Sequence, residues 1–362
     1  MGPSDDAVSS AGDIRVGTTV DVGAAQGGDP RFRPATVRID LSTCVSRYGP
    51  PDGALAAIRN LRSAALHEHP YEAASALIAA YGAYLGVPTK ELVVGRGISE
   101  LIWQLAFRLP AGCVTLPLPA YTEYHQAFPT AARLVSTDVE HHDLSDIACQ
   151  LEAGQIVLLS NPHNPTGRAF SRAQLLEVAQ RPHAGVLVVD ESYVEFCRDP
   201  ASVTVIGAPL GNIVVLRSPS KFFGIAGARV GVAWSGAAQG LDLLTASRGS
   251  WPVSAVEVAA AAAALEDWEW AAANRENQLS DVEWLEDHIS HLGQVVPGAV
   301  THFRLLRTPA ATRIAQDLAA AGLGVRVFDE RHGLTGPALR ITAPRREDRG
   351  RVAAMLHSVV GS

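Results

Sequence analysis

Short apolar runs alternate with helical stretches through the middle of the chain, and this alternation constrains the fold more than any other feature. Stretches such as 99–109 and 171–180 have the apolar spacing of helices. Apolar strands separated by helices are typical of a mostly parallel sheet covered on both faces, whose ligands bind at the carboxyl ends of the strands. The strand-like runs are LVVG (92–95), CVTL (113–116), RLVST (133–137), QIVLLS (155–160), GVLVVD (185–190), NIVVLRS (212–218) and RVGVAWS (229–235).

The last third of the chain has a different pattern. A long helical region (about 254–292) precedes the strand-like runs THFRLL (301–306), GVRVF (324–328) and ALRIT (338–342), which indicates a smaller α+β domain. A chain of 362 residues is also long enough for two cores. We therefore predict three parts: a flexible N-terminal arm over 1–36, a large domain over 51–250, and a small domain over 37–50 and 251–362.

Composition excludes several classes of protein. The net charge of −7 argues against a nucleic-acid partner, and no apolar run approaches the length of a membrane span. The first residues lack the basic start and apolar run of a secretory signal. The four cysteines are too far apart to suggest a metal or redox site. These features predict a cytoplasmic enzyme or binding protein without a metal.

Lysine is rare in this chain. Of its 30 basic residues, only Lys90 and Lys221 are lysines. Any chemistry that needs a side-chain primary amine therefore has two candidates. Lys90 lies in the polar turn PTKE and is expected at the surface, whereas Lys221 lies three residues beyond a predicted buried strand.

Several motifs stand where predicted strands of the large domain end, and together they resemble one family. The motifs are NPHNPTG (161–167), VVDESYVEF (188–196), SPSKFFGIAGARVG (218–231) and LRIT (339–342). They are similar to those of the fold type I enzymes that use pyridoxal phosphate (PLP), in the histidinol-phosphate aminotransferase-like branch. The matches run from about residue 39 to 342, which covers nearly the whole chain.

The resemblance implies PLP as cofactor and assigns residues to the parts of its ring. Lys221 would hold the cofactor covalently and move protons, for which its pKa must be lowered. Asp190 would pair with the pyridine nitrogen, and Asn164 and Tyr193 would donate hydrogen bonds to the 3-oxygen. Tyr121 would stack on the ring.

Other residues are assigned to the phosphate and the substrate. A helix that opens at Gly97, Ile98 and Ser99 would offer amide groups to the phosphate. Its remaining partners would be Ser218, Ser220 and Arg229. Arg340 would hold the substrate α-carboxylate with two hydrogen bonds.

The sequence departs from the family pattern at three places. The tyrosine that usually reaches the neighbouring subunit's cofactor corresponds to His69 or, after a small shift, Tyr71, which implies a homodimer with shared active sites. Counting from Gly324, the usual phosphate-binding arginine is replaced by Phe328, with Arg326 two residues earlier on the same strand face. Arg47 and Tyr48 replace parts of the substrate-side loop, and we expect Tyr48 to contact substrate.

These departures predict a substrate other than histidinol phosphate. Asp329 and Glu330 suggest a cationic side chain, such as that of a guanidine-bearing amino acid. The expected reaction is amino transfer between an amino acid and a 2-oxo acid. Decarboxylation or a cyclase reaction on the same scaffold stays open, because the motifs belong to the cofactor site that all of them share. A regulatory role is disfavoured, since the first 36 residues lack basic helices.

Overall fold

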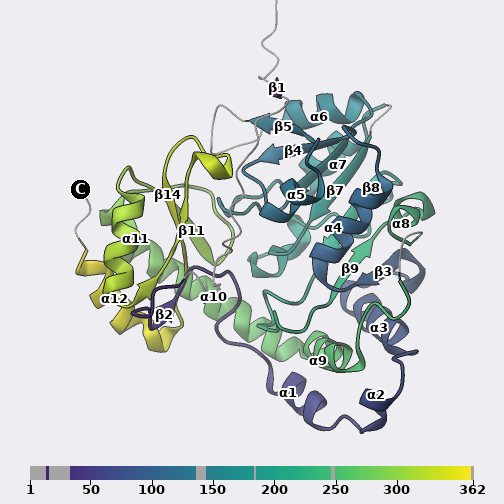
Figure 1. Ribbon diagram of the computed structural model, residues 1–362, viewed down its shortest axis with the longest axis horizontal. Coiled ribbons are helices and arrows are strands. Elements are labelled where there is room, and N and C mark those ends of the chain that lie inside the picture. The colour runs from purple at the N-terminus through teal and green to yellow at the C-terminus, as the bar shows by residue number, and fades with distance from the viewer. Residues whose placement is uncertain (1–13, 16–32, 136–143, 183–184, 246–248, 360–362) are drawn as a thin grey trace, which may run out of the picture.

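The computed structural model describes residues 14–15, 33–135, 144–182, 185–245 and 249–359 (Figure 1). Its large sheet has the strand order β1-β5-β4-β6-β7-β8-β9-β3. The pairs from β5 through β8 are parallel, while β9 is antiparallel to both β8 and β3. This confirms the predicted mostly parallel sheet. The strands are β1 (Ile14–Arg15), β3 (Leu92–Gly95), β4 (Val114–Leu118), β5 (Ala132–Val135), β6 (Ile156–Ser160), β7 (Val186–Asp190), β8 (Ile213–Arg217) and β9 (Gly231–Trp234).

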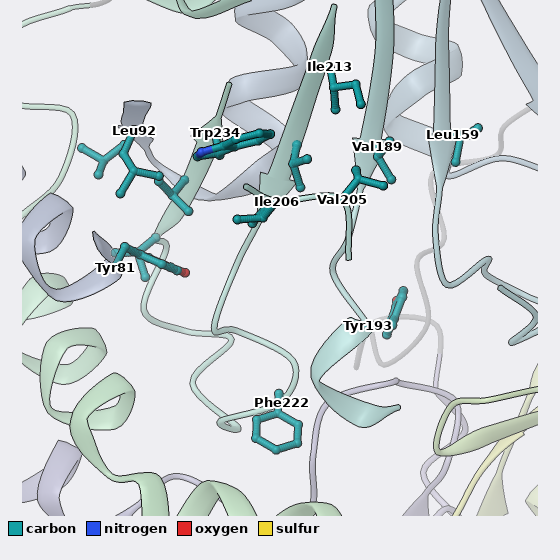
Figure 2. Close-up of a cluster of buried hydrophobic side chains, with 14 of the residues drawn as sticks. Tyr81, Leu92, Leu159, Val189, Tyr193, Val205, Ile206, Ile213, Phe222 and Trp234 are labelled. Carbon is teal, nitrogen blue, oxygen red and sulfur yellow. The ribbon is translucent and has the colours of Figure 1, made fainter. Parts of the chain in front are cut away.

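Helices cover both faces of this sheet, which explains why its strands are apolar at successive positions. On β7, Leu187 and Val189 belong to one buried cluster and Val188 to the other. The first cluster, part of which is drawn in Figure 2, packs against α3 (Ala73–Leu85), α6 (Leu144–Glu152), α7 (Arg172–Ala179) and α9 (Ala255–Glu266). The second packs against α4 (Gly97–Arg108), α5 (Thr122–Ala127) and α8 (Ala238–Thr245).

A second, antiparallel sheet has the order β10-β11-β14-β13 and lies beside the large one, with the long helix α10 running between them (Figure 1). A short parallel pair joins β2 to β12, so residues 39–40 pair with residues 323–324. The predicted domain boundaries stay a prediction, which this pairing favours for 37–50. The remaining elements are α1 (Asp52–Arg59), α2 (Ala64–His67), β2 (Ile39–Asp40), α10 (Trp268–Ile289), β10 (Gln294–Val295), β11 (Phe303–Arg307), α11 (Ala311–Ala320), β12 (Leu323–Gly324), β13 (Arg326–Phe328), β14 (Ala338–Thr342) and α12 (Arg349–His357).

The structure refines one expectation about local structure and leaves the predicted N-terminal arm a prediction. The long helical region is two helices, because the chain breaks at Asp267, whose side chain accepts a hydrogen bond from the Trp270 amide at 3.0 Å and so begins α10. In the predicted N-terminal arm, Ile14–Arg15 form β1 against β5, and residues 1–13 and 16–32 lie outside the described part. None of the helices in the described ranges is long and apolar enough to cross a membrane.

Candidate active site

A cavity of about 450 Å³ opens at the carboxyl ends of β4, β6, β7 and β8, facing β13 and β14. This volume is in the usual range for cofactor and small-molecule sites. The cavity brings together twelve residues that the sequence predicted for the site: Gly97, Ile98, Ser99, Tyr121, Asn164, Asp190, Tyr193, Ser218, Ser220, Lys221, Arg229 and Arg340.

Lys221 lines the cavity from the loop after β8, whereas Lys90 is exposed in a short turn of 3₁₀ helix (Thr89–Glu91). Burial lowers the pKa of the Lys221 amine, because a buried ammonium loses its hydration, and the guanidinium groups of Arg340 and Arg229 lower it further. A lowered pKa leaves more of the amine unprotonated at neutral pH. Of the two lysines, only Lys221 therefore has a setting suited to covalent chemistry and proton transfer.

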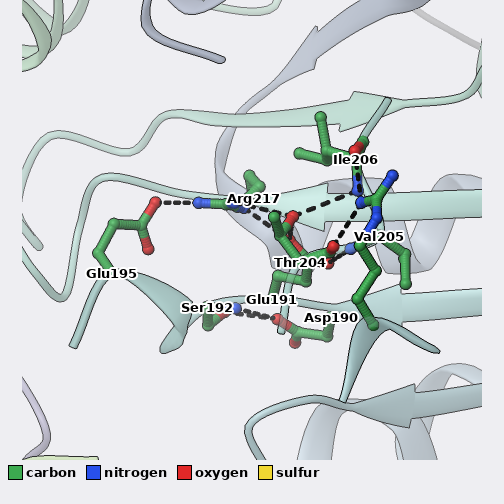
Figure 3. A network of polar contacts seen from close by, with 9 residues as sticks. Asp190, Glu191, Ser192, Glu195, Thr204, Val205, Ile206 and Arg217 are labelled. Atoms are coloured by element: carbon green, nitrogen blue, oxygen red, sulfur yellow. Dashed lines mark hydrogen bonds and ion pairs between the residues drawn. The ribbon is translucent and has the colours of Figure 1, made fainter. Parts of the chain in front are cut away.

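Asp190 ends β7 at the base of the cavity, and three donors hold its carboxylate. The Ser192 amide and hydroxyl donate to Oδ1 at 2.9 and 2.6 Å (Figure 3), and the Tyr124 hydroxyl donates to Oδ2 at 2.6 Å. Burial raises the pKa of Asp190, while these hydrogen bonds oppose that rise. The carboxylate is thus fixed in direction and surrounded by neutral donors.

A buried network of ion pairs lies next to Asp190 and connects the ends of β7 and β8 (Figure 3). The Arg217 guanidinium at the end of β8 contacts Glu191, with Nε 2.9 Å from Oε2, and also pairs with Glu195. Thr204 completes the network by donating to Glu191 Oε2 at 2.6 Å. Glu191 directly follows Asp190, and Arg217 directly precedes Ser218. The network therefore fixes the spacing between those two neighbours.

Across the cavity, the first turn of α4 and the loop after β8 form a cradle for an anion. Gly97 has φ +76°, and a Cβ built there would stand 2.9 Å from Arg229 Nη2, so the guanidinium packs directly against the backbone. The Ser218 hydroxyl lies 2.7 Å from the Ser220 hydroxyl and 2.8 Å from the Val230 carbonyl oxygen. Helix amides, two hydroxyls and an arginine suit the phosphate of PLP. Together with Lys221 and Asp190, this donor set fits the expected cofactor.

Asn164 joins the cofactor side of the cavity to Arg340. Its amide nitrogen donates to the Tyr193 hydroxyl at 3.2 Å, and its amide oxygen accepts from Arg340 Nη1 at 2.6 Å. Arg340 Nη2 donates to the Ser42 carbonyl at 2.5 Å. Its Nε is buried without a hydrogen-bond partner among the described residues. A buried, unsatisfied guanidinium donor in a cavity is suited to a ligand carboxylate.

The strand β13 places both Arg326 and Phe328, the two alternatives for the usual phosphate-binding position, at the cavity. Arg326 pairs in register with Arg340 on β14, and both line the cavity together with Phe328. The centroid of the Phe328 ring lies 5.7 Å from the guanidinium carbon of Arg326 and 5.4 Å from that of Arg340. An arginine thus remains on this strand because residues two apart share one face.

The two acidic residues that suggested a cationic substrate do not line the cavity. Asp329 pairs with His332, with Oδ1 2.9 Å from Nδ1, and Glu330 is exposed. His332 itself lines the cavity. With Arg326, Arg340 and Arg229 on the same cavity, the charge around the ligand is positive, which gives no support to a guanidine-bearing substrate.

The expected contact of Tyr48 with substrate stays a prediction, which the structure does not favour. Its hydroxyl donates to Asp281 at 2.6 Å on α10, and burial with this bond raises its pKa to about 12. The side chain therefore packs against α10 and does not line the cavity. Thr43 and Cys44, earlier in the same loop, line it instead.

His69 and Tyr71 do not line this chain's cavity. His69 is exposed and stacks on Trp251 with ring centroids 4.1 Å apart, and Tyr71 is 69% exposed beside it. Their assignment to a neighbouring subunit's site stays a prediction.

Sequence reasoning missed three residues of the site. Tyr124 and Ser192 hold Asp190, and His163 lies between two loops, with Nε2 2.8 Å from the Pro119 carbonyl oxygen and Nδ1 2.8 Å from the Thr166 hydroxyl. Tyr124 follows Tyr121 by one helical turn, a spacing that puts both on one face. That spacing was the available signal for Tyr124.

Comparison with known proteins identifies relatives over almost the whole chain. The family model for aminotransferase class I and II matches residues 36–355. A histidinol-phosphate aminotransferase of Anaeromyxobacter sp. (strain Fw109-5) is 32% identical over 334 residues, covering 89% of this chain and 91% of that protein. One of Burkholderia pseudomallei (strain K96243) is 31% identical over 313 residues, covering 83% and 86%.

Solved structures show the same fold. The histidinol-phosphate aminotransferase of Sinorhizobium meliloti, in complex with pyridoxal-5'-phosphate, aligns with a TM-score of 0.76 at 23% identity, covering 88% of this chain and 90% of that one. An L-threonine-O-3-phosphate decarboxylase of Porphyromonas gingivalis aligns with a TM-score of 0.74 at 22% identity, covering 88% and 98%.

Proposed function

Because the chain belongs to the aminotransferase class I and II family, whose cofactor is PLP, we propose that it moves an amino group between an amino acid and a 2-oxo acid. The observation that carries this proposal is the placement of Arg340. Arg340 lines the cavity that Lys221 also lines, its Nε has no hydrogen-bond partner among the described residues, and Asn164 links it to Tyr193.

PLP supplies an electron-withdrawing ring that stabilises negative charge at the substrate Cα. The protein's part is to orient the substrate and move one proton. Arg340 would bind the α-carboxylate, and the Lys221 amine, whose pKa burial lowers, would accept the Cα proton on Nζ and donate it again on the cofactor side of the substrate nitrogen. Asp190 would hold the ring nitrogen and balance its positive charge.

We further propose that the amino donor carries a negatively charged group distant from its α-carbon. Arg326 supports this, because its guanidinium lines the cavity on the strand beside Arg340 and could pair there with an anionic group of the donor. This replaces the guanidine-bearing substrate. Histidinol phosphate, for which the relatives are named, is an anionic amine without an α-carboxylate, and the test compares it with amino acids.

A donor screen tests both statements. PLP-loaded protein is mixed with histidinol phosphate, glutamate, arginine, histidine and phenylalanine, and single-turnover conversion to the pyridoxamine form is followed by absorbance while released carbon dioxide is measured. We expect conversion without carbon dioxide, with anionic donors at least about tenfold faster than neutral ones, since hydrogen bonds to charged groups contribute roughly 1.5–3 kcal/mol. Carbon dioxide without conversion would establish a decarboxylase instead.

The variant Arg326→Gln sharpens the screen. We expect it to slow anionic donors roughly 10- to 100-fold and neutral donors little. The matched control is Arg313→Gln on α11, whose side chain is half exposed and pairs with Asp317. Equal losses for anionic and neutral donors would contradict the role of Arg326.

We also propose a homodimer in which His69 or Tyr71 reaches the neighbouring subunit's cofactor. These residues support it because they form an exposed aromatic cluster with Trp251, which is 44% exposed, and close by Leu66 is 79% exposed. Sedimentation at micromolar concentration tests this, and a stable monomer with full activity would contradict it.

A further inference from the structure

Tyr124 is one of the largest fully buried side chains, yet its hydroxyl forms a hydrogen bond at the base of the cavity. The residue is 1% exposed on α5, among the apolar residues of the second core cluster. Its hydroxyl donates to Asp190 Oδ2 at 2.6 Å. A buried tyrosine hydroxyl needs a partner, and here the partner is the carboxylate proposed to face the cofactor ring.

The donors around Asp190 are divided between its two oxygens. The amide and the hydroxyl of Ser192 both donate to Oδ1. Among the described residues, the hydroxyl of Tyr124 donates to Oδ2. Neutral donors stabilise the ionised form of a carboxylate and make it a weaker base. Burial pushes the pKa of Asp190 upward, and these donors oppose that rise.

Tyr124 also contacts the residue expected to stack on the ring. The Tyr121 and Tyr124 rings meet edge to face, with centroids 5.7 Å apart and an interplanar angle of 87°. One short helical segment thus brings both side chains to the place where the ring is expected.

From this geometry we propose that Tyr124 is a positioning residue that keeps Asp190 a weak, oriented base, so that the proton shared with the cofactor stays on the ring nitrogen. If Asp190 lost this donor it would become a stronger base, and the shared proton would move from the ring nitrogen toward the carboxylate. The ring would then lose its positive charge and withdraw electrons less strongly. This inference rests on the proposed role of Asp190 but not on which reaction follows.

The test is Tyr124→Phe, read by the nitrogen-15 chemical shift of isotope-labelled PLP bound to the enzyme without substrate. We expect the shift to move toward that of an unprotonated pyridine, and single-turnover amino transfer to fall roughly 10- to 100-fold, as for a lost bond to a charged group. The matched control is Tyr81→Phe. Tyr81 is equally buried, and its hydroxyl has no hydrogen-bond partner among the described residues (Figure 2).

Each outcome of the test decides the proposal. A Tyr124→Phe enzyme that binds labelled PLP with an unchanged shift would overturn it, whatever its activity. Should this variant fail to fold, Ser192→Ala removes one Oδ1 donor while the Ser192 amide remains, and must move the shift in the same direction by a smaller amount. No movement in that variant would equally overturn it. A failed donor screen with the expected shift would reject the proposed reaction and leave Tyr124's role standing.

Discussion

The two walls of the cavity differ in how their polar groups are satisfied. The cofactor wall, made by Asp190, Ser218, Lys221, Arg229 and the start of α4, follows the strand ends of the large sheet, and its acidic and hydroxyl groups are held by neighbours inside the protein. The substrate wall, made by Arg326, Phe328, His332 and Arg340, keeps a guanidinium donor without a partner in the described chain. The polar groups of the cofactor wall are therefore held in place by the protein itself, whereas the substrate wall still has a donor that a ligand could satisfy.

The largest expected effect comes from removing Lys221. Lys221→Ala should lower single-turnover amino transfer by roughly 10⁴-fold or more, because it removes both the covalent link and the proton-transfer group. Borohydride reduction of the PLP-loaded protein followed by mass spectrometry should find the label on Lys221 in the parent and nowhere in the variant. The matched control is Lys90→Ala at an exposed position, and equal damage from both variants would contradict the assignment.

A smaller effect should come from substitution of Arg340, which should impair substrate use without weakening the binding of PLP. Arg340→Lys keeps the charge but loses the planar fork, so we expect kcat/KM to fall roughly 10- to 100-fold while PLP affinity changes little. Titration of PLP and steady-state kinetics measure the two quantities separately. Arg345→Lys, just beyond β14, serves as control. A comparable loss of PLP affinity would break the distinction between the walls.

The smallest effect concerns a buried residue behind both walls. His302 stacks on Phe196 at 3.5 Å and its Nε2 lies 3.0 Å from the Cys44 carbonyl oxygen. Burial lowers its pKa from 6.5 to about 3. Between these two pH values His302 is protonated in the unfolded chain and neutral in the folded one. This contribution to stability is fully present above about pH 6.5 and is lost as the pH falls toward 3.

We therefore expect His302→Phe to reduce the slope of the free energy of unfolding against pH by about 1.4 kcal/mol per pH unit between about pH 4 and 6. Urea denaturation at several pH values measures this slope. His357→Phe, at an exposed position on α12, should leave it unchanged. An unaltered slope in the first variant would mean that His302 is already protonated in the folded protein.

The residues of the cofactor wall could be predicted because they stand at strand ends, which the apolar pattern of the sequence also marks. Asp190 and Ser218 stand where apolar runs end, and a strand end is visible in a sequence as the point where apolar residues give way to polar ones. The two-faced burial of β7 likewise explains its unbroken run of apolar residues. Such local signals need no knowledge of distant contacts.

The substrate wall was predicted poorly because it depends on register and on contacts between distant segments. Whether Arg326 or Phe328 faces the ligand is decided by the pairing of β13 with β14, and the structure admits both. The partner of Tyr48, Asp281, lies 233 residues away, so nothing in the sequence indicated their hydrogen bond.

The pairing of β2 with β12 has a consequence for how the protein is made. Ile39 leaves the ribosome early but lies against Leu323, about 280 positions later. At elongation rates of about 5–20 residues per second, the early segment waits roughly 15–60 s for its partner. The loop that follows it, which brings Thr43 and Cys44 to the cavity and the Ser42 carbonyl to Arg340, therefore receives its final place only after Leu323 has been synthesised.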